Sequence, residues 1–166
     1  MRLGALDANK VASFMFHPEL FDDMSDDHSD AAWKKGGRYY EINVAKTLLT
    51  LPQVCVFLHP NRHVLFMMTL RTNTLWEVHT MIMPEGRGKE AVEATRGAAK
   101  WFFENSKCEK IITYIPVFNR KAKLFAKLVG MKEEGICTKS FKKHNQLHDQ
   151  WFLGLEKETI CLQEQQ

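Results

Sequence analysis

The spacing of apolar residues first indicates a group of β-strands in the middle of the chain. Residues 54–59 and 63–71 are rich in β-branched and aromatic residues, and the turn residues Pro60-Asn61-Arg62 separate them. This pattern predicts a β-hairpin. Residues 75–83 continue the β pattern until Pro84 ends it. Three successive strands joined by short turns predict an antiparallel meander.

From residue 89 the period of the pattern becomes helical. Small and aromatic residues recur at three- and four-residue spacing, in Ala91, Ala94, Ala98 and Phe102. This spacing predicts a helix whose narrow apolar stripe lies close to a sheet. The pattern ends at Asn105-Ser106.

The last third of the chain predicts a strand, a helix and a hairpin. Residues 110–117 have the composition of a buried strand, and the helix that follows is capped by Asn119 and closed by Gly130. Residues 131–141 and 150–156 predict two final strands, with residues 142–149 as a polar loop between them. The basic residues of this region, Lys139, Lys142 and Lys143, are interpreted as a solvated cluster.

The first 50 residues predict a helical N-terminal part. Pro18 stands at the first turn of a short helix, where its missing N–H costs nothing. Residues 22–30 are acidic and predict a loop, Gly36-Gly37 predicts a flexible point, and residues 41–49 predict a second helix. No repeat or linker interrupts the chain, so residues 1–166 are expected to form one domain.

Composition narrows the range of functions. Hydrophobic residues make up 45% of the 166 residues, and no window approaches the roughly 18 consecutive apolar residues of a membrane helix. No secretory signal is recognised, and four scattered cysteines lack metal-type spacing, so we expect a cytoplasmic protein without a metal site. The net charge of +3 argues against a nucleic-acid partner.

The segment most informative about chemistry is the glycine-containing turn before the predicted helix at residue 89. A strand that leads through such a turn into a helix leaves backbone N–H groups pointing outwards, where the helix dipole favours an anion. Arg87 and Lys89 add positive charge, so a pyrophosphate fits this place. The alternative is a plain strand–helix turn without a ligand.

Here the sequence resembles the GNAT acyltransferase superfamily. Arg87-Gly88-Lys89-Glu90-Ala91-Val92 aligns with the R/Q-x-x-G-x-G/A segment of that family, and the later helix carries its second pattern. The residues of that pattern are Asn119, Ala122, Phe125 and Gly130-Met131, followed by Glu134-Gly135. The resemblance covers residues 75–135, the expected cofactor-binding core. It implies an α/β (α+β) GNAT fold with a mixed, mostly antiparallel sheet, flanked by helices, in which the fourth and fifth strands of the family are splayed.

Within the superfamily the sequence is most similar to small acetyltransferase-like proteins of bacteriophages, some of which are head or internal virion proteins. This similarity is carried by His17-Pro18, Val78-His79-Thr80, Pro84, Arg87-Gly88 and Asn119. It implies a location in the host cytoplasm or in the virion.

The resemblance implies acetyl-coenzyme A as the cofactor, bound without a metal. The pantetheine arm is expected to pair with backbone groups of Met81, Ile82 and Met83 and to form a hydrogen bond with Asn119. Lys123 is expected to reach a phosphate. The pyrophosphate is expected on the backbone N–H groups of Arg87, Gly88, Lys89, Glu90, Ala91 and Val92.

Glu77 and His79 are the candidate catalytic residues. They lie two apart on one predicted strand and therefore share a face. The family places its base on this strand, and a Glu–His pair could relay a proton near neutral pH. The alternative is that His79 is a structural histidine and Glu77 a surface residue.

Three residues depart from the family pattern. Glu90 and Val92 stand where glycine or alanine is usual, and Phe125 replaces a tyrosine that serves as general acid. Either Tyr114, a water or another group then protonates the leaving thiolate, or the chemistry is slow or absent.

Two main functions remain open. The first is an N-acetyltransferase that transfers an acetyl group from acetyl-coenzyme A to an amine of a small molecule or protein. The second is a non-catalytic phage head-assembly or internal virion protein that keeps the fold and binds phage structural proteins. A homodimer formed through the C-terminal hairpin is compatible with either.

Overall fold

A computed structural model describes residues 6–162 of the chain. In chain order, the elements are α1 (Ala8–Met15), α2 (Pro18–Met24), α3 (Asp27–Thr50), β1 (Val54–Leu58), β2 (Val64–Leu70), β3 (Leu75–Ile82), the 3-10 helix η1 (Pro84–Gly86), α4 (Lys89–Asn105), β4 (Lys110–Pro116), α5 (Arg120–Val129), β5 (Lys132–Lys143), β6 (Gln146–Glu156) and α6 (Lys157–Leu162). No helix in the described part of the chain is long and apolar enough to cross a membrane.

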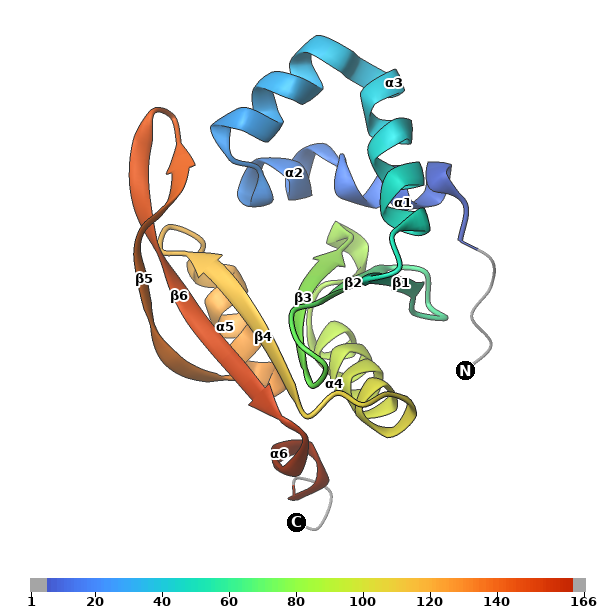
Figure 1. Ribbon diagram of the computed structural model, residues 1–166, viewed down its shortest axis with the longest axis vertical. Helices are drawn as coiled ribbons and strands as arrows, with labels where there is room; N and C mark the ends of the chain where they lie inside the picture. The colour runs from blue at the N-terminus through green and yellow to red at the C-terminus, as the bar shows by residue number, and fades with distance from the viewer. Residues whose placement is uncertain (1–5, 163–166) are drawn as a thin grey trace.

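Six strands form one twisted sheet in the order β1-β2-β3-β4-β6-β5 (Figure 1). All neighbouring strands are antiparallel except β3 and β4, which run parallel. This mixed, mostly antiparallel sheet confirms the predicted fold class, and the meander predicted for residues 54–83 is present as β1, β2 and β3.

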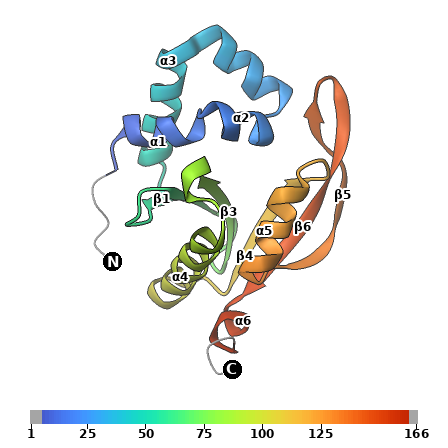
Figure 2. The ribbon, with the colours of Figure 1, turned by 180° about the vertical axis from the view of Figure 1, so that it is seen from behind.

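The two faces of the sheet are covered by different helices. Helices α4 and α5 lie on the same face, as Figure 2 shows from behind, and their small residues bring them close to the strands. Ala91, Ala94 and Ala98 of α4 are buried there, as the predicted apolar stripe required. On the other face, Phe14 of α1 and Leu20 of α2 pack with residues of β2 and β3.

The N-terminal part is more helical than predicted. The expected loop at residues 22–30 is wrong, because α2 continues to Met24 and α3 begins at Asp27. The acidic residues themselves explain the difference, since the side chain of Asp26 accepts a hydrogen bond from the Ser29 N–H at 2.7 Å and caps α3. Gly37 has φ 51° and ψ −143°, so α3 bends at the predicted flexible point.

The C-terminal hairpin is longer than predicted. Residues 142–149 were expected to form a loop, but β5 extends to Lys143 and β6 begins at Gln146. His144 and Asn145 form the turn between them with φ values of 51° and 60°, which are the positive values of a type I′ turn. The interpretation of the basic cluster as solvated is wrong for Lys143, which is only 5% exposed.

Candidate functional site

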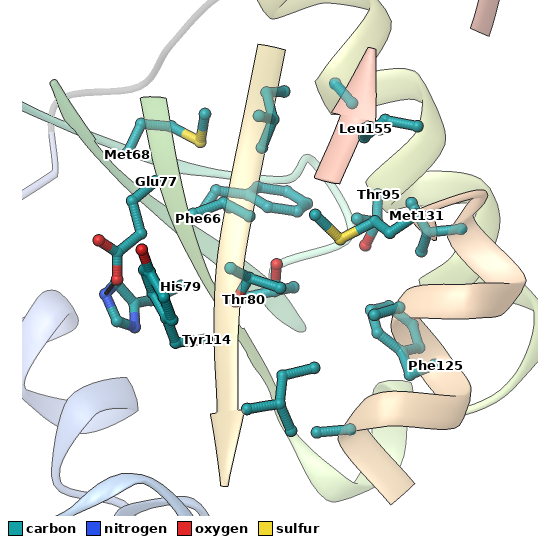
Figure 3. Close-up of a pocket in the computed structure, with 18 of the residues that line it drawn as sticks. Phe66, Met68, Glu77, His79, Thr80, Thr95, Tyr114, Phe125, Met131 and Leu155 are labelled. Atoms are coloured by element: carbon teal, nitrogen blue, oxygen red, sulfur yellow. Dashed lines mark ion pairs between the residues drawn. The ribbon is translucent and has the colours of Figure 1, made fainter. Parts of the chain in front are cut away.

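A cavity occupies the gap that opens between β3 and β4. The two strands pair only over Leu75–Glu77 and Lys110–Ile112, although both continue well beyond these residues. The cavity has a volume of about 200 Å³. Its lining includes Glu77, His79 and Tyr114 on one side of β4, and Phe125, Met131 and Leu155 on the other (Figure 3). It therefore passes through the sheet.

The unpaired edge of β3 supplies backbone groups to this gap. Met83 donates its N–H to the carbonyl of His63 on the β2 side, at 2.9 Å. Because hydrogen-bonding direction alternates along an antiparallel ladder, the backbone groups of Val78, Thr80 and Ile82 point towards β4. Among the three residues predicted to meet pantetheine, Ile82 has this orientation, whereas Met81 and Met83 face β2.

The turn before α4 leaves an open helix N-terminus. Gly88 caps α4 with φ 110° and ψ −152°, a conformation that favours glycine, and no side chain caps the helix. The first N–H groups of α4, from Lys89 to Ala91, therefore remain available to an anion. Arg87 lies beside the turn and contacts Glu19 of α2 at 3.4 Å.

Glu90 is turned away from this helix end. Its carboxylate accepts a hydrogen bond from the Asn61 side chain in the β1–β2 turn at 2.9 Å. Val92 instead lines a groove between α4 and α5. Glu90, which departs from the family pattern, thus has its hydrogen-bond partner outside the groove.

The groove between α4 and α5 is the cationic surface of the site. Its lining consists of Gly88, Lys89, Val92, Arg96, Lys121, Leu124, Phe125 and Leu128. Three of these residues are basic, and four have apolar side chains. Sequence reasoning missed Arg96 and Lys121. The helical spacing of Lys89, Val92 and Arg96 was the available signal, because it places them on one face of α4.

Lys123, which was expected at a phosphate, lies elsewhere. Its ammonium is 2.8 Å from the Glu133 carboxylate of β5 and 3.8 Å from the ring centre of Trp151 on β6. These contacts hold the side chain on the sheet side of α5. The structure therefore places Lys121, and not Lys123, at the groove.

Asn119 lies at the end of the cavity, between β4 and α5. Its side-chain oxygen accepts the Ala122 N–H at 3.0 Å and so caps α5, as predicted. The carboxamide nitrogen has no hydrogen-bond partner among residues 6–162. Since Asn119 also lines the cavity, this nitrogen can donate to a ligand there.

Glu77 and His79 face the N-terminal helices. Alternation along β3 places them on the same face as Met81, which packs with Phe14 and Leu20. The His79 Nε2 atom lies 3.2 Å from Oε1 of Glu77, and Arg71 donates to Oε2 of the same carboxylate through Nε at 2.7 Å and through Nη2. The interpretation of Glu77 as a surface residue is wrong, because it is only 5% exposed.

The environment of Glu77 keeps its carboxyl group ionised. Burial alone would raise the pKa of Glu77, but hydrogen bonds and charges from His79 and Arg71 outweigh burial and hold the pKa below its ordinary value. A carboxylate with a low pKa is a weak base. Glu77 is therefore better suited to orient His79 than to accept a proton itself.

The contacts of Glu77 with Arg71 and His79 make a pH-dependent contribution to the free energy of unfolding. A carboxyl group whose pKa is lower in the folded state stabilises the fold fully above its unfolded pKa of about 4.3 and loses that contribution as the pH falls through the folded pKa. We expect Glu77→Gln to lower the free energy of unfolding by about 1 to 3 kcal/mol at pH 7, since Arg71 and His79 lose a charged partner. The loss should shrink below pH 4.

Urea unfolding of both proteins at pH 7 and at pH 3.5 measures this effect. Glu93→Gln is the matched control, because the Glu93 side chain is exposed on α4. An equal loss of stability at both pH values in Glu77→Gln would contradict the assignment.

Tyr114 and Phe125 complete the cavity. The Tyr114 ring packs on Phe152 with 5.1 Å between ring centres, and alternation along β4 puts it on the face of Glu77 and His79. Burial, with smaller contributions from Cys137 and Glu77, raises the pKa of the Tyr114 hydroxyl, so it keeps its proton at neutral pH. Phe125 lines both the cavity and the groove and therefore marks the place where they meet.

Solved structures of acetyltransferases have the same fold. A spermidine N-acetyltransferase from Vibrio cholerae, solved in complex with CoA and spermine, matches with a TM-score of 0.67 and 17% identity over 96% of both chains. A GNAT-family acetyltransferase from Bacillus anthracis gives a TM-score of 0.68 at 14% identity, over 92% of this chain and 90% of the other. A ribosomal-protein-S5-alanine acetyltransferase from Vibrio fischeri gives 0.68 at 15% identity, over 95% and 92%.

Two further comparisons concern sequence. Protein p31 of the Acyrthosiphon pisum secondary endosymbiont phage 1 is 29% identical over 89 residues, which span 53% of this chain and 57% of that protein. A family model described as a protein of unknown function, DUF2824, matches residues 31–159. The fold is thus that of the GNAT acetyltransferases, and the chain belongs to the DUF2824 family.

Proposed function

We propose that the protein is an acyl-coenzyme A-dependent N-acyltransferase. The observation that carries this proposal is the cavity through the sheet. On one side it meets, at Phe125, a groove with basic residues and an open helix N-terminus. On the other side it is lined by the Glu77–His79 pair. Such an arrangement lets two reactants approach a single point from opposite faces.

The residues present fit acetyl-coenzyme A. The N–H groups at the start of α4 would hold the pyrophosphate, with Lys89, Arg96 and Lys121 as the nearby cationic side chains. The free edge of β3 and the carboxamide nitrogen of Asn119 would hold the pantetheine arm. When bound, the coenzyme supplies an acyl group activated as a thioester.

The pair on β3 would prepare the acceptor amine. An amine is protonated in water and becomes a nucleophile only after it loses a proton. His79 can accept that proton, because its Nδ1 has no hydrogen-bond partner among the described residues and Nε2 is held by Glu77. Arg71 fixes the Glu77 carboxylate, and Tyr114 can return a proton to the leaving sulfur.

The acceptor is proposed to be a primary amine that enters from the face of the N-terminal helices. One solved relative in fold is a spermidine N-acetyltransferase with bound spermine, so polyamines are the first acceptors to test. The purified protein is incubated with acetyl-coenzyme A and with spermidine, spermine, amino acids or a library of lysine-containing peptides. Thiol release and the product mass are then measured.

Amine-dependent thiol release together with an acetylated product supports the proposal. Thiol release that no amine accelerates, with no acetylated product in any of these mixtures, would contradict it.

Phe125→Tyr tests the missing general acid. A tyrosine at this junction of cavity and groove can donate a proton to the leaving sulfur, so we expect kcat to rise about tenfold without a change in the KM for acetyl-coenzyme A. Tyr114→Phe should slow the original protein and should be tolerated once Tyr is present at position 125. Equal effects of Tyr114→Phe in both backgrounds would show that Tyr114 is not the present donor.

A non-catalytic role in phage assembly is the second candidate. The match to a phage protein and the phenylalanine at position 125 favour it. Expression of the tagged protein during phage infection should then recover capsid or portal proteins with it. Its absence from particles and assembly intermediates would leave the enzyme as the better proposal.

A further inference from the structure

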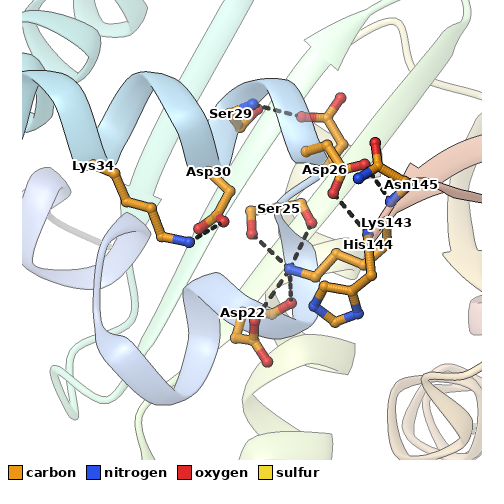
Figure 4. A network of polar contacts seen from close by, with 10 residues as sticks. Asp22, Ser25, Asp26, Ser29, Asp30, Lys34, Lys143, His144 and Asn145 are labelled. Atoms are coloured by element: carbon orange, nitrogen blue, oxygen red, sulfur yellow. Dashed lines mark hydrogen bonds and ion pairs between the residues drawn. The ribbon is translucent and has the colours of Figure 1, made fainter.

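The tip of the β5–β6 hairpin is joined to the N-terminal helices by a buried lysine. Lys143, at the end of β5, is only 5% exposed. Its ammonium reaches the α2–α3 junction (Figure 4), where it donates to the carbonyl oxygens of Asp22 at 2.9 Å and Ser25 at 3.1 Å. It also lies 3.1 Å from both Asp22 Oδ1 and Ser25 Oγ.

A second contact joins the same two segments. The carboxylate of Asp27, at the start of α3, accepts the backbone N–H of His144 at 2.7 Å and that of Asn145 at 2.8 Å. These residues form the type I′ turn, whose positive φ values present both N–H groups to one carboxylate. We call the contacts of Lys143 and Asp27 together the docking contact.

The docking contact satisfies the buried Lys143 ammonium only in this arrangement of hairpin and helices. An ammonium buried without partners is costly, and the four oxygen atoms around Lys143 remove that cost only while the hairpin lies against the helices. Without the contact, water would solvate Lys143 and the hairpin tip would be free to move away.

The residues next to the docking contact form one end of the cavity. Asp23 and Met24 lie in the sequence between Asp22 and Ser25, the two residues that Lys143 contacts. Phe141 lies two residues before Lys143. All three line the cavity. Helix α2 covers the sheet face to which Glu77 and His79 belong, so this end is the one from which an amine reaches His79.

We propose that Lys143 is a positioning residue for the acceptor, which rests on the proposed acyltransferase function. The docking contact holds Asp23 and Phe141, which both line the cavity, as walls of an acceptor subsite. A carboxylate and an aromatic ring on these walls suit a small cationic amine. Lys143 therefore sets acceptor affinity and the exclusion of water, while the coenzyme groove on the other face is independent of it.

Lys143→Met tests this proposal, with Lys132→Met as the control because Lys132 is exposed at the other end of β5. The first measurement is amide hydrogen exchange of residues 139–150. We expect exchange at His144 and Asn145 to accelerate at least tenfold in Lys143→Met and to stay unchanged in the control. Acetyl-coenzyme A affinity, measured by calorimetry, should stay within twofold in both.

The second measurement is kinetic. With an acceptor found in the amine screen, Lys143→Met should raise the acceptor KM at least tenfold and leave the KM for acetyl-coenzyme A unchanged. In the absence of an amine, hydrolysis of bound acetyl-coenzyme A by Lys143→Met should also be at least threefold faster than in the unaltered protein, because the cavity opens to water.

These outcomes separate this proposal from the proposed function. Failure of the unaltered protein to bind acetyl-coenzyme A removes both. Binding of the coenzyme with faster exchange at the tip, but with unchanged acceptor KM and hydrolysis, overturns the role of Lys143 alone. Unchanged exchange at His144 and Asn145, or a parallel loss of coenzyme affinity in Lys143→Met, overturns it as well.

Discussion

Replacing His79 by alanine is expected to lower kcat for acyl transfer by about 100- to 1,000-fold, within the range that a general base contributes. His79 is the cavity residue whose free ring nitrogen can take the proton from an ammonium, and Glu77 holds its other nitrogen. The affinity for acetyl-coenzyme A should not change, because the groove proposed to hold the coenzyme lies on the opposite face of the sheet. Initial rates of thiol release give kcat, and calorimetry gives the affinity for acetyl-coenzyme A.

Glu77→Gln provides the comparison for this prediction. A glutamine can still contact the imidazole, so the loss in kcat should be about tenfold and smaller than that in His79→Ala. Added imidazole should restore part of the activity of His79→Ala and none of the activity of Glu77→Gln. A decrease below fivefold in His79→Ala would contradict its role as the base.

Charge reversal in the groove is expected to have the second-largest effect. Lys121→Glu should weaken acetyl-coenzyme A binding by about 10- to 100-fold, the equivalent of one or two charge-assisted hydrogen bonds lost to a phosphate. Lys127→Glu changes the charge of the same helix on the side that faces Glu133, so its coenzyme affinity should remain within about threefold.

Arg96→Glu should also weaken binding, although its effect has two sources. The Arg96 guanidinium lines the groove and also donates to the carbonyl of Leu128 at 2.6 Å, which joins α4 to α5. Lys121 therefore gives the cleaner measurement. Equal affinities of Lys121→Glu and Lys127→Glu would show that the phosphates lie outside this groove.

The sequence was sufficient to predict the elements whose ends carry strong local signals. Gly88 before α4, and Asn119 and Gly130 at the two ends of α5, act through their own backbone and side chains. The strands of the meander are also marked locally, because runs of β-branched and aromatic residues are separated by recognisable turn residues. Those segments are present as predicted.

Positions that depend on tertiary contacts could not be predicted in the same way. The acidic residues at 22–30 suggest a loop, but Asp26 caps a helix and Asp27 accepts N–H groups from a turn 117 residues later in the chain. Lys143 is chemically an exposed residue and is buried only because Asp22 and Ser25 surround it. No local pattern encodes such a pairing.

The choice between Lys121 and Lys123 illustrates the same limit within one helix. The two residues lie about 200° apart around α5, so a shift of two positions moves an ammonium from the groove to the sheet. Lys123 is directed by Glu133 and Trp151, which belong to β5 and β6. Family position alone does not contain that information.

The most direct test of the central claim is a calorimetric titration of the purified protein with acetyl-coenzyme A. We expect one binding site with a dissociation constant in the micromolar range, about −8 kcal/mol, and a weaker site in Lys121→Glu. No heat of binding up to millimolar coenzyme, with the protein folded by circular dichroism, would contradict an acyl-coenzyme A site between α4 and α5.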